Sequence, residues 1–580
     1  MNKKILKLLI LVILIIPNIC NASDWEDLQK VFKYETVDTE AFTVNGNTIT
    51  LNEDIICDNQ DLGPLEIKGE SPNNKVFIID LNGHNIDRNL SEGHENGQVF
   101  YLDTADLTIN DSVGTGKITG GHNITGVIPG DIIYGGAGAI VLYSSNLTLN
   151  NGSITGNTAR LVGALNLHVS TFIMNGGSIT DNHTDGWCSQ YDIGAINLYS
   201  NSTMIMNGGT ISNHKEAFVS AINVSSRSEL TINGGTIENN TTRDNKNLYK
   251  NVIGTIYVND NSQVIINDGT FRNNKNEGNG GVLSIDENND YFSNVIINGG
   301  TFTGNIATFG GVIYANESLL NVNGGTFTNN YSRRGGVIYN NNSKVKVLGG
   351  TFTNNRSTEY GAAYYIAKIE EYTGENIFGK SVVMKNNMVY EIEDDLCLHA
   401  GNTIKIEDPT TMSIGVKVMD GTNVFITDEI EDYHEYLFST NDICEVIYND
   451  SKIQIVSGAR VYIPNHEGLE VEVIDTNTNE EIERSYTSNE EKLSYYVDRG
   501  SYLTIKFNTK EGYKFEEEQE DIIINGLLDS KTINYNNIIK LEKPSDDIII
   551  NPQTGDNLII YITLSLLSLS SIILIKKRVY

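Results

Sequence analysis

The amino-acid sequence predicts an all-β protein, a right-handed parallel β-helix followed by a small β-sandwich or β-grasp-like domain. Glycines recur at intervals of 25 residues, as at Gly300, Gly325 and Gly350. Apolar and polar residues alternate over short stretches, which places the apolar side chains on one face of a strand. Apolar residues do not recur at the spacing of three or four that is typical of an amphipathic helix. A glycine-rich period of this length indicates stacked repeats.

Each repeat contains three short strand patterns. The first follows a glycine, as in Gly311 and Ile313, and the second alternates, as in Leu320 and Val322. The third follows a glycine turn and begins near Phe327. One repeat of about 25 residues therefore predicts one coil of three strands, and successive coils would stack about 4.8 Å apart.

Asparagine recurs after the third strand of each coil, and His214 replaces it once. Asparagine tolerates left-handed backbone geometry and can hydrogen-bond to its copy in the next coil. These residues are therefore predicted to be structural: Asn157, Asn182, Asn240, Asn274, Asn305, Asn330 and Asn355.

The repeats are more regular in some parts of the chain than in others, and this difference divides the chain into segments. Residues 23–120 carry less regular strands and predict an N-terminal cap with the first coils, and residues 121–365 carry the regular repeats. Residues 366–458 predict irregular final coils. Residues 459–541 lose the glycine columns and predict the small β domain, and residues 542–550 form a linker.

The N-terminus has the features of a secretory signal peptide. Lys3, Lys4 and Lys7 precede an apolar run at residues 8–16, and a polar stretch ends on Ala22. Such a segment is removed on export. We expect cleavage between Ala22 and Ser23.

The C-terminus combines a pentapeptide, an apolar segment at residues 558–575 and a basic tail. The apolar segment is long enough to span a bilayer, and the tail would stay on the cytoplasmic side. Residues 551–580 resemble a sortase sorting signal, whose family pattern is Leu-Pro-x-Thr-Gly; asparagine replaces the leucine here. The resemblance implies cleavage between the last two residues of the pentapeptide and attachment to peptidoglycan through Thr554. The pentapeptide consists of Asn551, Pro552, Gln553, Thr554 and Gly555.

The repeats also resemble known surface proteins. Residues 327–330 and 335–338 are similar to the Phe-x-x-Asn and Gly-Gly-Ala-Ile motifs of polymorphic outer-membrane adhesins, with Val337 in place of alanine. Residues 78–86 resemble the first coils of pectate-lyase-like β-helices. Together with the sorting signal, the chain resembles Gram-positive cell-wall-anchored surface proteins. The resemblance implies a secreted protein on the extracellular face of the wall, with only transient contact with the membrane.

The composition argues against several kinds of partner and chemistry. The net charge of −33 disfavours nucleic acid and anionic polymers. Four cysteines outside the signal peptide show neither a disulfide framework nor a metal spacing. We expect no cofactor, no metal and no catalytic residues, because no metal, nucleophile or phosphate-loop motif is present. The adjacent pair Asp394 and Asp395 would point to opposite faces of a strand and is not expected to be catalytic.

Three weaker patterns remain. Four tyrosines share a predicted outward column and could form a ligand platform or simply cover the sheet: Tyr257, Tyr314, Tyr339 and Tyr364. The acidic loop 286–290 could hold calcium, although a solvated loop is the simpler interpretation. His183 and His214 lie one coil apart and could share a metal, although surface histidines are favoured.

The sequence thus predicts an adhesin-like binding module that meets host, matrix or neighbouring-cell ligands, either protein or glycan. The first alternative is a wall-anchored polysaccharide lyase or glycoside hydrolase on the same fold. The second is a passive surface stalk or biofilm component.

Overall fold

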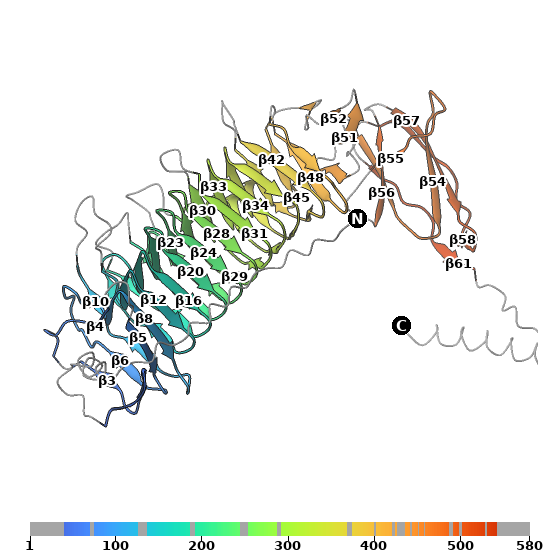
Figure 1. The fold of residues 1–580 in the computed structure, drawn as a ribbon. Coiled ribbons are helices and arrows are strands. Elements are labelled where there is room, and N and C mark those ends of the chain that lie inside the picture. The colour runs from blue at the N-terminus through green and yellow to red at the C-terminus, as the bar shows by residue number, and fades with distance from the viewer. Residues whose placement is uncertain are drawn as a thin grey trace, which may run out of the picture.

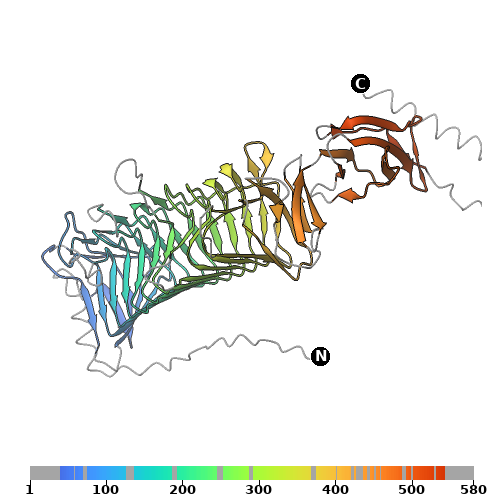
Figure 2. The same ribbon diagram turned by 90° about the horizontal axis from the view of Figure 1, so that it is seen from above.

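The structure is a computed structural model that describes residues 40–541 except residues 58, 70–74, 126–135, 186–191, 244–252, 287–291, 368–373, 400–401, 420–423, 426–435, 441–443, 450–451, 458, 486–490, 498–500 and 528–530. Short strands stack into an elongated parallel β-helix, and a small β domain follows at its C-terminal end (Figure 1). The view from above shows the regular stacking of the coils (Figure 2). The predicted fold class is confirmed.

Three long ladders of strands form the walls of the β-helix, and each coil adds one strand to a ladder; all pairs are parallel except β1 with β2 in the second ladder. The first ladder contains β4 (Leu65–Lys68), β7 (Phe100–Asp103), β11 (Ile140–Tyr143), β15 (Leu165–His168), β19 (Ile196–Tyr199), β23 (Ile222–Val224), β27 (Ile256–Val258), β30 (Leu283–Asp286), β33 (Ile313–Asn316), β37 (Ile338–Asn341), β41 (Tyr364–Ile366) and β46 (Leu396–Leu398). The second contains β1 (Phe42–Asn45), β2 (Thr48–Leu51), β5 (Lys75–Asp80), β8 (Ala105–Asn110), β12 (Asn146–Leu149), β16 (Thr171–Met174), β20 (Thr203–Met206), β24 (Glu229–Ile232), β28 (Gln263–Ile266), β31 (Asn294–Ile297), β34 (Leu319–Val322), β38 (Lys344–Val347), β42 (Glu375–Gly379) and β47 (Lys405–Glu407). The third contains β3 (Ile55–Ile56), β6 (Asn85–Asp87), β9 (Lys117–Thr119), β13 (Ser153–Thr155), β17 (Ser178–Thr180), β21 (Thr210–Ser212), β25 (Thr236–Glu238), β29 (Thr270–Arg272), β32 (Thr301–Thr303), β35 (Thr326–Thr328), β39 (Thr351–Thr353), β43 (Val383–Lys385), β48 (Ser413–Val418) and β50 (Leu437–Ser439).

A fourth, shorter ladder follows the third strand and was not predicted. It contains β10 (His122–Asn123), β14 (Thr158–Ala159), β18 (His183–Thr184), β22 (Lys215–Ala217) and β26 (Thr241–Thr242), then β36 (Tyr331–Arg334), β40 (Arg356–Tyr360), β44 (Met388–Val389) and β45 (Ile392–Glu393). Single bridges at Lys275 and Ile306 join the two groups. The last two strands, β44 and β45, pair antiparallel.

The interior is filled by columns of like side chains, because every second residue of a strand points inward. The third ladder gives the clearest column, Phe271, Phe302, Phe327 and Phe352, all at most 1% exposed. Their ring centroids lie 4.4–4.7 Å apart in nearly parallel planes. Such stacking buries a large apolar area and adds to the stability of the coil-to-coil contact.

A buried asparagine ladder runs beside these phenylalanines. The Nδ2 of Asn305 donates to Asn330 Oδ1 (3.1 Å), and the Nδ2 of Asn330 donates in turn to Asn355 Oδ1 (3.0 Å). The left-handed backbone belongs to the residue before each ladder asparagine, such as Asn329 and Asn354, both at φ 57°. The sequence interpretation gave both roles to one residue, whereas the structure divides them between two neighbours.

The glycines that precede the first-ladder strands, such as Gly311 before β33 and Gly336 before β37, are required because successive coils approach each other closely there. A Cβ at Gly311 would lie 2.2 Å from the carbonyl oxygen of Gly336, and a Cβ at Gly336 would lie 2.0 Å from that of Ala362. A side chain at either glycine would therefore push the coils apart.

Antiparallel strands close both ends of the solenoid. At the N-terminal end β1 pairs antiparallel with β2. Near the C-terminal end β52 (Lys452–Ser457) pairs antiparallel with β49 (Val424–Phe425) and β51 (Cys444–Asn449). Caps of this kind cover sheet edges that would otherwise invite aggregation.

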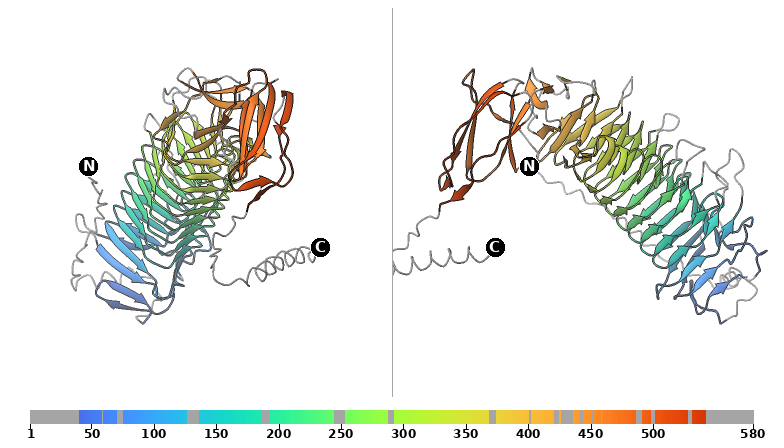
Figure 3. Two further views of the ribbon diagram at one scale, coloured as in Figure 1. Left: turned by 90° about the vertical axis from the view of Figure 1, so that its right-hand side faces the viewer. Right: turned by 180° about the vertical axis from the view of Figure 1, so that it is seen from behind.

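The small domain, which follows the last coils of the solenoid (Figure 3), has its own core. Its strands are β53 (Ala459–Pro464), β54 (Leu469–Asp475), β55 (Arg484–Ser485), β56 (Lys492–Val497), β57 (Ser501–Thr509), β58 (Tyr513–Phe515), β59 (Ile522–Leu527), β60 (Lys531–Thr532) and β61 (Ile538–Lys540). They pair antiparallel except for one short parallel pairing of β53 with β60. Among the described residues, no helix is long and apolar enough to cross a membrane.

Candidate functional site

The outer face of the first ladder carries residues that the core does not constrain. In register across β7, β11 and β15, one outward column consists of Tyr101, Val141 and Asn166. The next column consists of Asp103, Tyr143 and His168 and continues to Tyr199 on β19. Because strand pairing fixes the register, residues far apart in the sequence meet on this face.

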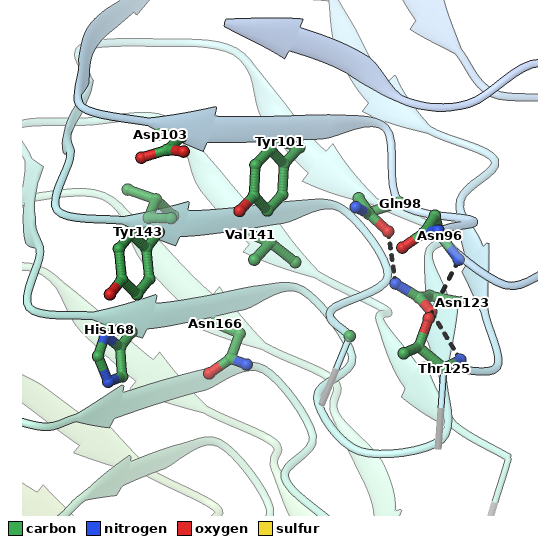
Figure 4. Close-up of a pocket in the computed structure, with 12 residues that line it drawn as sticks. Asn96, Gln98, Tyr101, Asp103, Asn123, Thr125, Val141, Tyr143, Asn166 and His168 are labelled. Atoms are coloured by element: carbon green, nitrogen blue, oxygen red, sulfur yellow. Dashed lines mark hydrogen bonds between the residues drawn. The ribbon is translucent and has the colours of Figure 1, made fainter. Parts of the chain in front are cut away.

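These two columns line a groove, here called the tyrosine–histidine groove, with a cavity volume of about 220 Å³. Figure 4 shows the two columns on one side and polar side chains of neighbouring segments on the other. The lining residues are Asn96, Gln98, Tyr101, Asp103, Asn123, Thr125, Gly136, Val141, Leu142, Tyr143, Asn166 and His168. The volume lies below the roughly 300–1,000 Å³ of pockets for drug-sized ligands. The groove therefore suits one ring-sized group of a longer molecule.

Aromatic rings form one edge of the groove. The rings of Tyr143 and His168 are stacked with centroids 5.0 Å apart and planes within 3° of parallel. Tyr199 extends the row at 6.1 Å from His168. Tyr143 is 40% exposed, so part of its ring is available to a ligand. Because the rings of Tyr143 and His168 cover part of each other's faces, a ligand would meet the exposed part of the Tyr143 ring and the edges of the row.

The opposite edge is a wall of amide and hydroxyl groups held by hydrogen bonds. Asn123 Nδ2 donates to Gln98 Oε1 (2.6 Å), and the backbone N–H of Thr125 donates to Asn123 Oδ1 (2.8 Å). The backbone N–H of Asn96 donates to Thr125 Oγ1 (3.0 Å). A Cβ at Gly136 would lie 2.0 Å from Asn123 Nδ2, so only glycine leaves room for this amide. The wall is therefore fixed before a ligand arrives.

The electrostatics of the groove suit an uncharged ligand. Among the described residues, its lining includes the carboxylate of Asp103 and no Lys or Arg; Lys68 lies outside the lining, 5.5 Å from the ring of Tyr101, and pairs with Glu66. Burial, and then Asp103, raises the pKa of the Tyr101 hydroxyl, which keeps that group protonated as a donor. Burial lowers the pKa of His168, so its imidazole is neutral at pH 7. Within the described part of the chain, the buried Nδ1 of His168 has no hydrogen-bond partner.

The predicted tyrosine column is wrong at one position. Tyr257, Tyr314 and Tyr339 lie in the outward column of the first ladder, but Tyr364 is fully buried and Tyr365 pairs with Tyr339 instead. One extra residue in β40 causes the shift, because Ser332 pairs with Ser357 whereas Arg334 pairs with Tyr360.

The outward tyrosines are closely packed. The ring centroids of Tyr314 and Tyr339 are 5.4 Å apart, and those of Tyr339 and Tyr365 are 5.3 Å apart. Tyr365 is only 3% exposed, and the Arg334 guanidinium lies 5.8 Å from its ring. A ligand platform on this column stays a prediction.

The interpretation of His183 and His214 as surface histidines is wrong for His214. His214 occupies the position of a ladder asparagine, fully buried, with Nδ1 and Nε2 each 3.1 Å from a backbone oxygen, of Asn182 and Ile179 respectively. His183 is exposed. In the described part of the chain, no group of three or more His, Cys, Asp or Glu side chains is placed to hold a metal ion.

The adjacent aspartates serve different structural contacts. Asp395 Oδ1 accepts from the backbone N–H (3.1 Å) and the Nδ2 (2.6 Å) of Asn387, so it ends the asparagine ladder. Asp394 pairs with Lys417 at 3.1 Å. Both carboxyl groups are fully buried and lie away from the groove.

Several predicted features lie outside the described residues. They are residues 287–290 of the acidic loop, the signal peptide with Ala22 and Ser23, and the sorting signal at residues 551–580.

The sequence analysis missed the tyrosine–histidine groove. Only part of its lining, at residues 96–103, comes from the less regular N-terminal coils, and its aromatic row extends over three successive coils rather than along the whole ladder. The available signal was the fourth residue of three successive first-ladder strands, Tyr143, His168 and Tyr199. Comparisons of the chain with protein-family models, with curated proteins and with solved structures gave no match.

Proposed function

We propose that the protein is displayed on the cell wall as an adhesin-like binding module, and that its tyrosine–histidine groove binds an uncharged sugar residue of a host, matrix or neighbouring-cell glycan. Display rests on the predicted signal peptide and sorting signal, with sortase and peptidoglycan as partners. The observation that carries the proposal is the stacked Tyr143 and His168 facing a wall of fixed amides.

This arrangement matches the chemistry of a sugar. A sugar ring has an apolar face of C–H groups that can lie against an aromatic ring, and it has hydroxyls that both donate and accept hydrogen bonds. Gln98, Asn123 and Asn166 line the groove but are at most 5% exposed, so they offer a ligand only small amide edges, whereas the less buried Asp103 supplies a strong acceptor. A ligand with a carboxylate or phosphate would meet Asp103 without a compensating cation among the lining residues.

A polysaccharide-processing enzyme is the alternative. Glycoside hydrolases commonly use two carboxyl groups about 5–5.5 Å or 6.5–9.5 Å apart. Asp103 is the one carboxylate among the residues that line the groove. This composition favours binding over hydrolysis.

The test uses residues 23–545, which contain every strand that the structure describes. The chain is applied to a glycan and matrix-protein array, and the same glycans are incubated with it and assayed for new reducing ends and unsaturated products. Saturable glycan binding without product is the expected result. Product would favour the enzyme instead, and the absence of both binding and product would favour a passive stalk.

Two variants connect binding to the groove. We expect Tyr143→Ala and His168→Ala each to weaken binding roughly tenfold, because an aromatic contact contributes about 0.5–1.5 kcal/mol beyond the area it buries. Tyr143→Phe keeps the ring and should retain most of the affinity. Tyr390→Ala is the matched control, since Tyr390 is 76% exposed and lies outside the groove lining. Equal binding by the Tyr143→Ala and Tyr390→Ala variants would place the ligand elsewhere.

A further inference from the structure

A second groove, here called the asparagine groove, lies in later coils at the turn between the third and fourth ladders. Its cavity volume is about 650 Å³. It is lined by Asn329, Asn330, Tyr331, Asn354, Asn355, Arg356, Asn386 and Met388. None of these residues lines the tyrosine–histidine groove, so the two grooves are separate.

The floor of the asparagine groove is rigid. Asn330 and Asn355 belong to the buried asparagine ladder, where Asn330 Nδ2 also donates to the carbonyl of Phe302 (2.9 Å) and Asn355 Nδ2 donates to Asn387 Oδ1 (2.8 Å). These contacts fix the turns on which the exposed lining residues sit. A ligand would therefore meet a site that is already ordered, which reduces the entropy cost of binding.

Two exposed rows border this floor. The residues with left-handed backbone, Asn329, Asn354 and Asn386, form one row of amides at φ 57–58°. The strand register aligns Tyr331 and Arg356 in the other row. Successive members of a row lie about 4.8 Å apart because that is the spacing of paired strands. The groove thus offers amides along one edge, and an aromatic ring and a guanidinium along the other.

The charge of Arg356 is not balanced by a contact within the described part of the chain. No ion pair or side-chain hydrogen bond of Arg356 is formed there, whereas the nearby Arg333 and Arg334 both bind Glu359, at 2.5 and 2.6 Å. The carboxylate of Glu393 lies at the edge of the groove, where it accepts from the backbone N–H of Asn386 (2.6 Å). The net charge of −33 opposes an acidic ligand at long range, but the exposed guanidinium of Arg356 gives this groove a local cation, which favours an acidic group at short range.

We propose that the asparagine groove binds a carboxylated sugar residue of a glycan. Arg356 pairs with the carboxylate, since its planar guanidinium can form two parallel hydrogen bonds to that group. Tyr331 lies against the sugar ring, and the amides of Asn329, Asn354 and Asn386 bind hydroxyls. The site does not depend on the function proposed for the tyrosine–histidine groove.

An acidic peptide fits the structure less well. Extended peptides commonly bind by adding a strand to an open sheet edge. At this groove β40 is paired on both sides, with β36 and β44, so no open edge is available there. The remaining contacts are side-chain amides and a ring, which suit a molecule rich in hydroxyls.

The test measures binding to residues 23–545 by calorimetry at 0.15 M salt, where a Debye length of about 8 Å screens the long-range repulsion by the acidic protein. The probes are sialyllactose, a galacturonate tetrasaccharide and a hyaluronan tetrasaccharide, each beside its methyl ester, and a tetraglutamate peptide. We expect at least one acidic sugar to bind and its methyl ester to bind at least tenfold more weakly. Failure of all three acidic sugars, or equal binding of the tetraglutamate peptide, would overturn the proposal.

Variants locate the site and separate it from the first groove. Arg356→Gln should weaken binding of the acidic sugar at least tenfold, and Arg356→Lys should retain part of the affinity. Arg227→Gln is the matched control, because it removes the same charge from an exposed turn outside the lining. Arg356 is exposed, so its variants should fold, which a melting curve verifies. Tyr143→Ala should leave acidic-sugar binding unchanged; a loss with Tyr143→Ala but not with Arg356→Gln would assign the ligand to the first groove and refute this proposal.

Discussion

The buried asparagine ladder predicts a large, position-specific loss of stability. The substitution Asn330→Ala removes four hydrogen bonds at once. Asn330 Oδ1 accepts from the backbone N–H (3.0 Å) and the Nδ2 (3.1 Å) of Asn305, and Asn330 Nδ2 donates to the carbonyl of Phe302 (2.9 Å) and to Asn355 Oδ1 (3.0 Å). All four groups lie in the interior, so water does not readily replace Asn330.

The magnitude follows from these contacts. A hydrogen bond contributes about 1 kcal/mol net, and an orphaned buried group costs about 1–3 kcal/mol. Asn355 Oδ1 keeps the bond from the backbone N–H of Asn330, and Asn305 Nδ2 keeps the carbonyl of Phe271, whereas the backbone N–H of Asn305 loses its acceptor. We therefore expect Asn330→Ala to destabilise the surrounding coils by about 3–5 kcal/mol.

The same coil offers a matched control. Asn323 belongs to a second asparagine ladder that is exposed, and its Nδ2 donates to Asn298 Oδ1 at 2.9 Å. Asn323→Ala is the same chemical change in solvent and should cost no more than about 0.5 kcal/mol.

The assay must report local stability, because a long solenoid need not unfold in one step. Amide hydrogen exchange of Asn305 and its neighbours gives the free energy of local opening, and the denaturant midpoint gives a global comparison. Equal effects of the two substitutions, or a loss below 1 kcal/mol for Asn330→Ala, would refute the idea that the buried ladder holds the coils together.

Three further predictions concern single residues of the interior. Burial lowers the pKa of His214 to about 4, so the unfolded chain binds more protons than the folded chain between about pH 4 and pH 6.5. The stability should therefore fall by up to about 3 kcal/mol as the pH drops through that window. His214→Asn should remove this dependence in acid-denaturation curves, and an unchanged curve would contradict the prediction. Burial holds the pKa of Asp395 well above its ordinary value, so the fold disfavours the charged form of this carboxyl group. The protein should therefore become less stable as the pH rises above the ordinary pKa of an aspartate. Asp395→Asn, which keeps an acceptor for Asn387, should raise the denaturant midpoint at pH 7 and change it less at pH 4. Tyr364 is fully buried, and its hydroxyl donates to Asn376 at 2.6 Å. In equilibrium unfolding, Tyr364→Ala should lower the free energy of unfolding by about 3–5 kcal/mol and Tyr364→Phe by about 1 kcal/mol. A small effect of both variants would place this ring outside the core.

The inward columns could be predicted because they repeat. Residues such as Phe302 and Phe327 occupy equivalent positions in successive coils, so their spacing reveals both the strand and its face. The error at Tyr364 shows the limit of this approach. Gly361 follows Gly336 by 25 residues, but its left-handed φ of 58° matches that of Gly335, at 64°. The true interval is therefore 26 residues, and one inserted residue is enough to exchange the two faces of a strand.

The outward residues could not be assigned in the same way. A ligand contact needs particular side chains in a few coils only, so the row Tyr143, His168 and Tyr199 gives a signal over three coils that does not repeat along the chain. Arg356 likewise occurs in one coil only: the equivalent position is Tyr331 in the preceding coil and Met388 in the next one. Which of these single residues share a groove depends on register and on the neighbouring turns, and both became visible only in the folded chain.

The inward and outward residues of each strand have different roles, which explains how one solenoid can hold two sites of different chemistry. Inward columns fix the coils, so an outward residue can change without disturbing the core. The described lining of the tyrosine–histidine groove includes a carboxylate and no Lys or Arg, whereas that of the asparagine groove includes Arg356. Along the fourth ladder, β14 and β40 are separated by seven coil-to-coil steps of about 4.8 Å, or roughly 34 Å. If both proposals hold, only a glycan longer than this span can occupy both grooves, and binding should strengthen sharply beyond that length because the second contact becomes intramolecular.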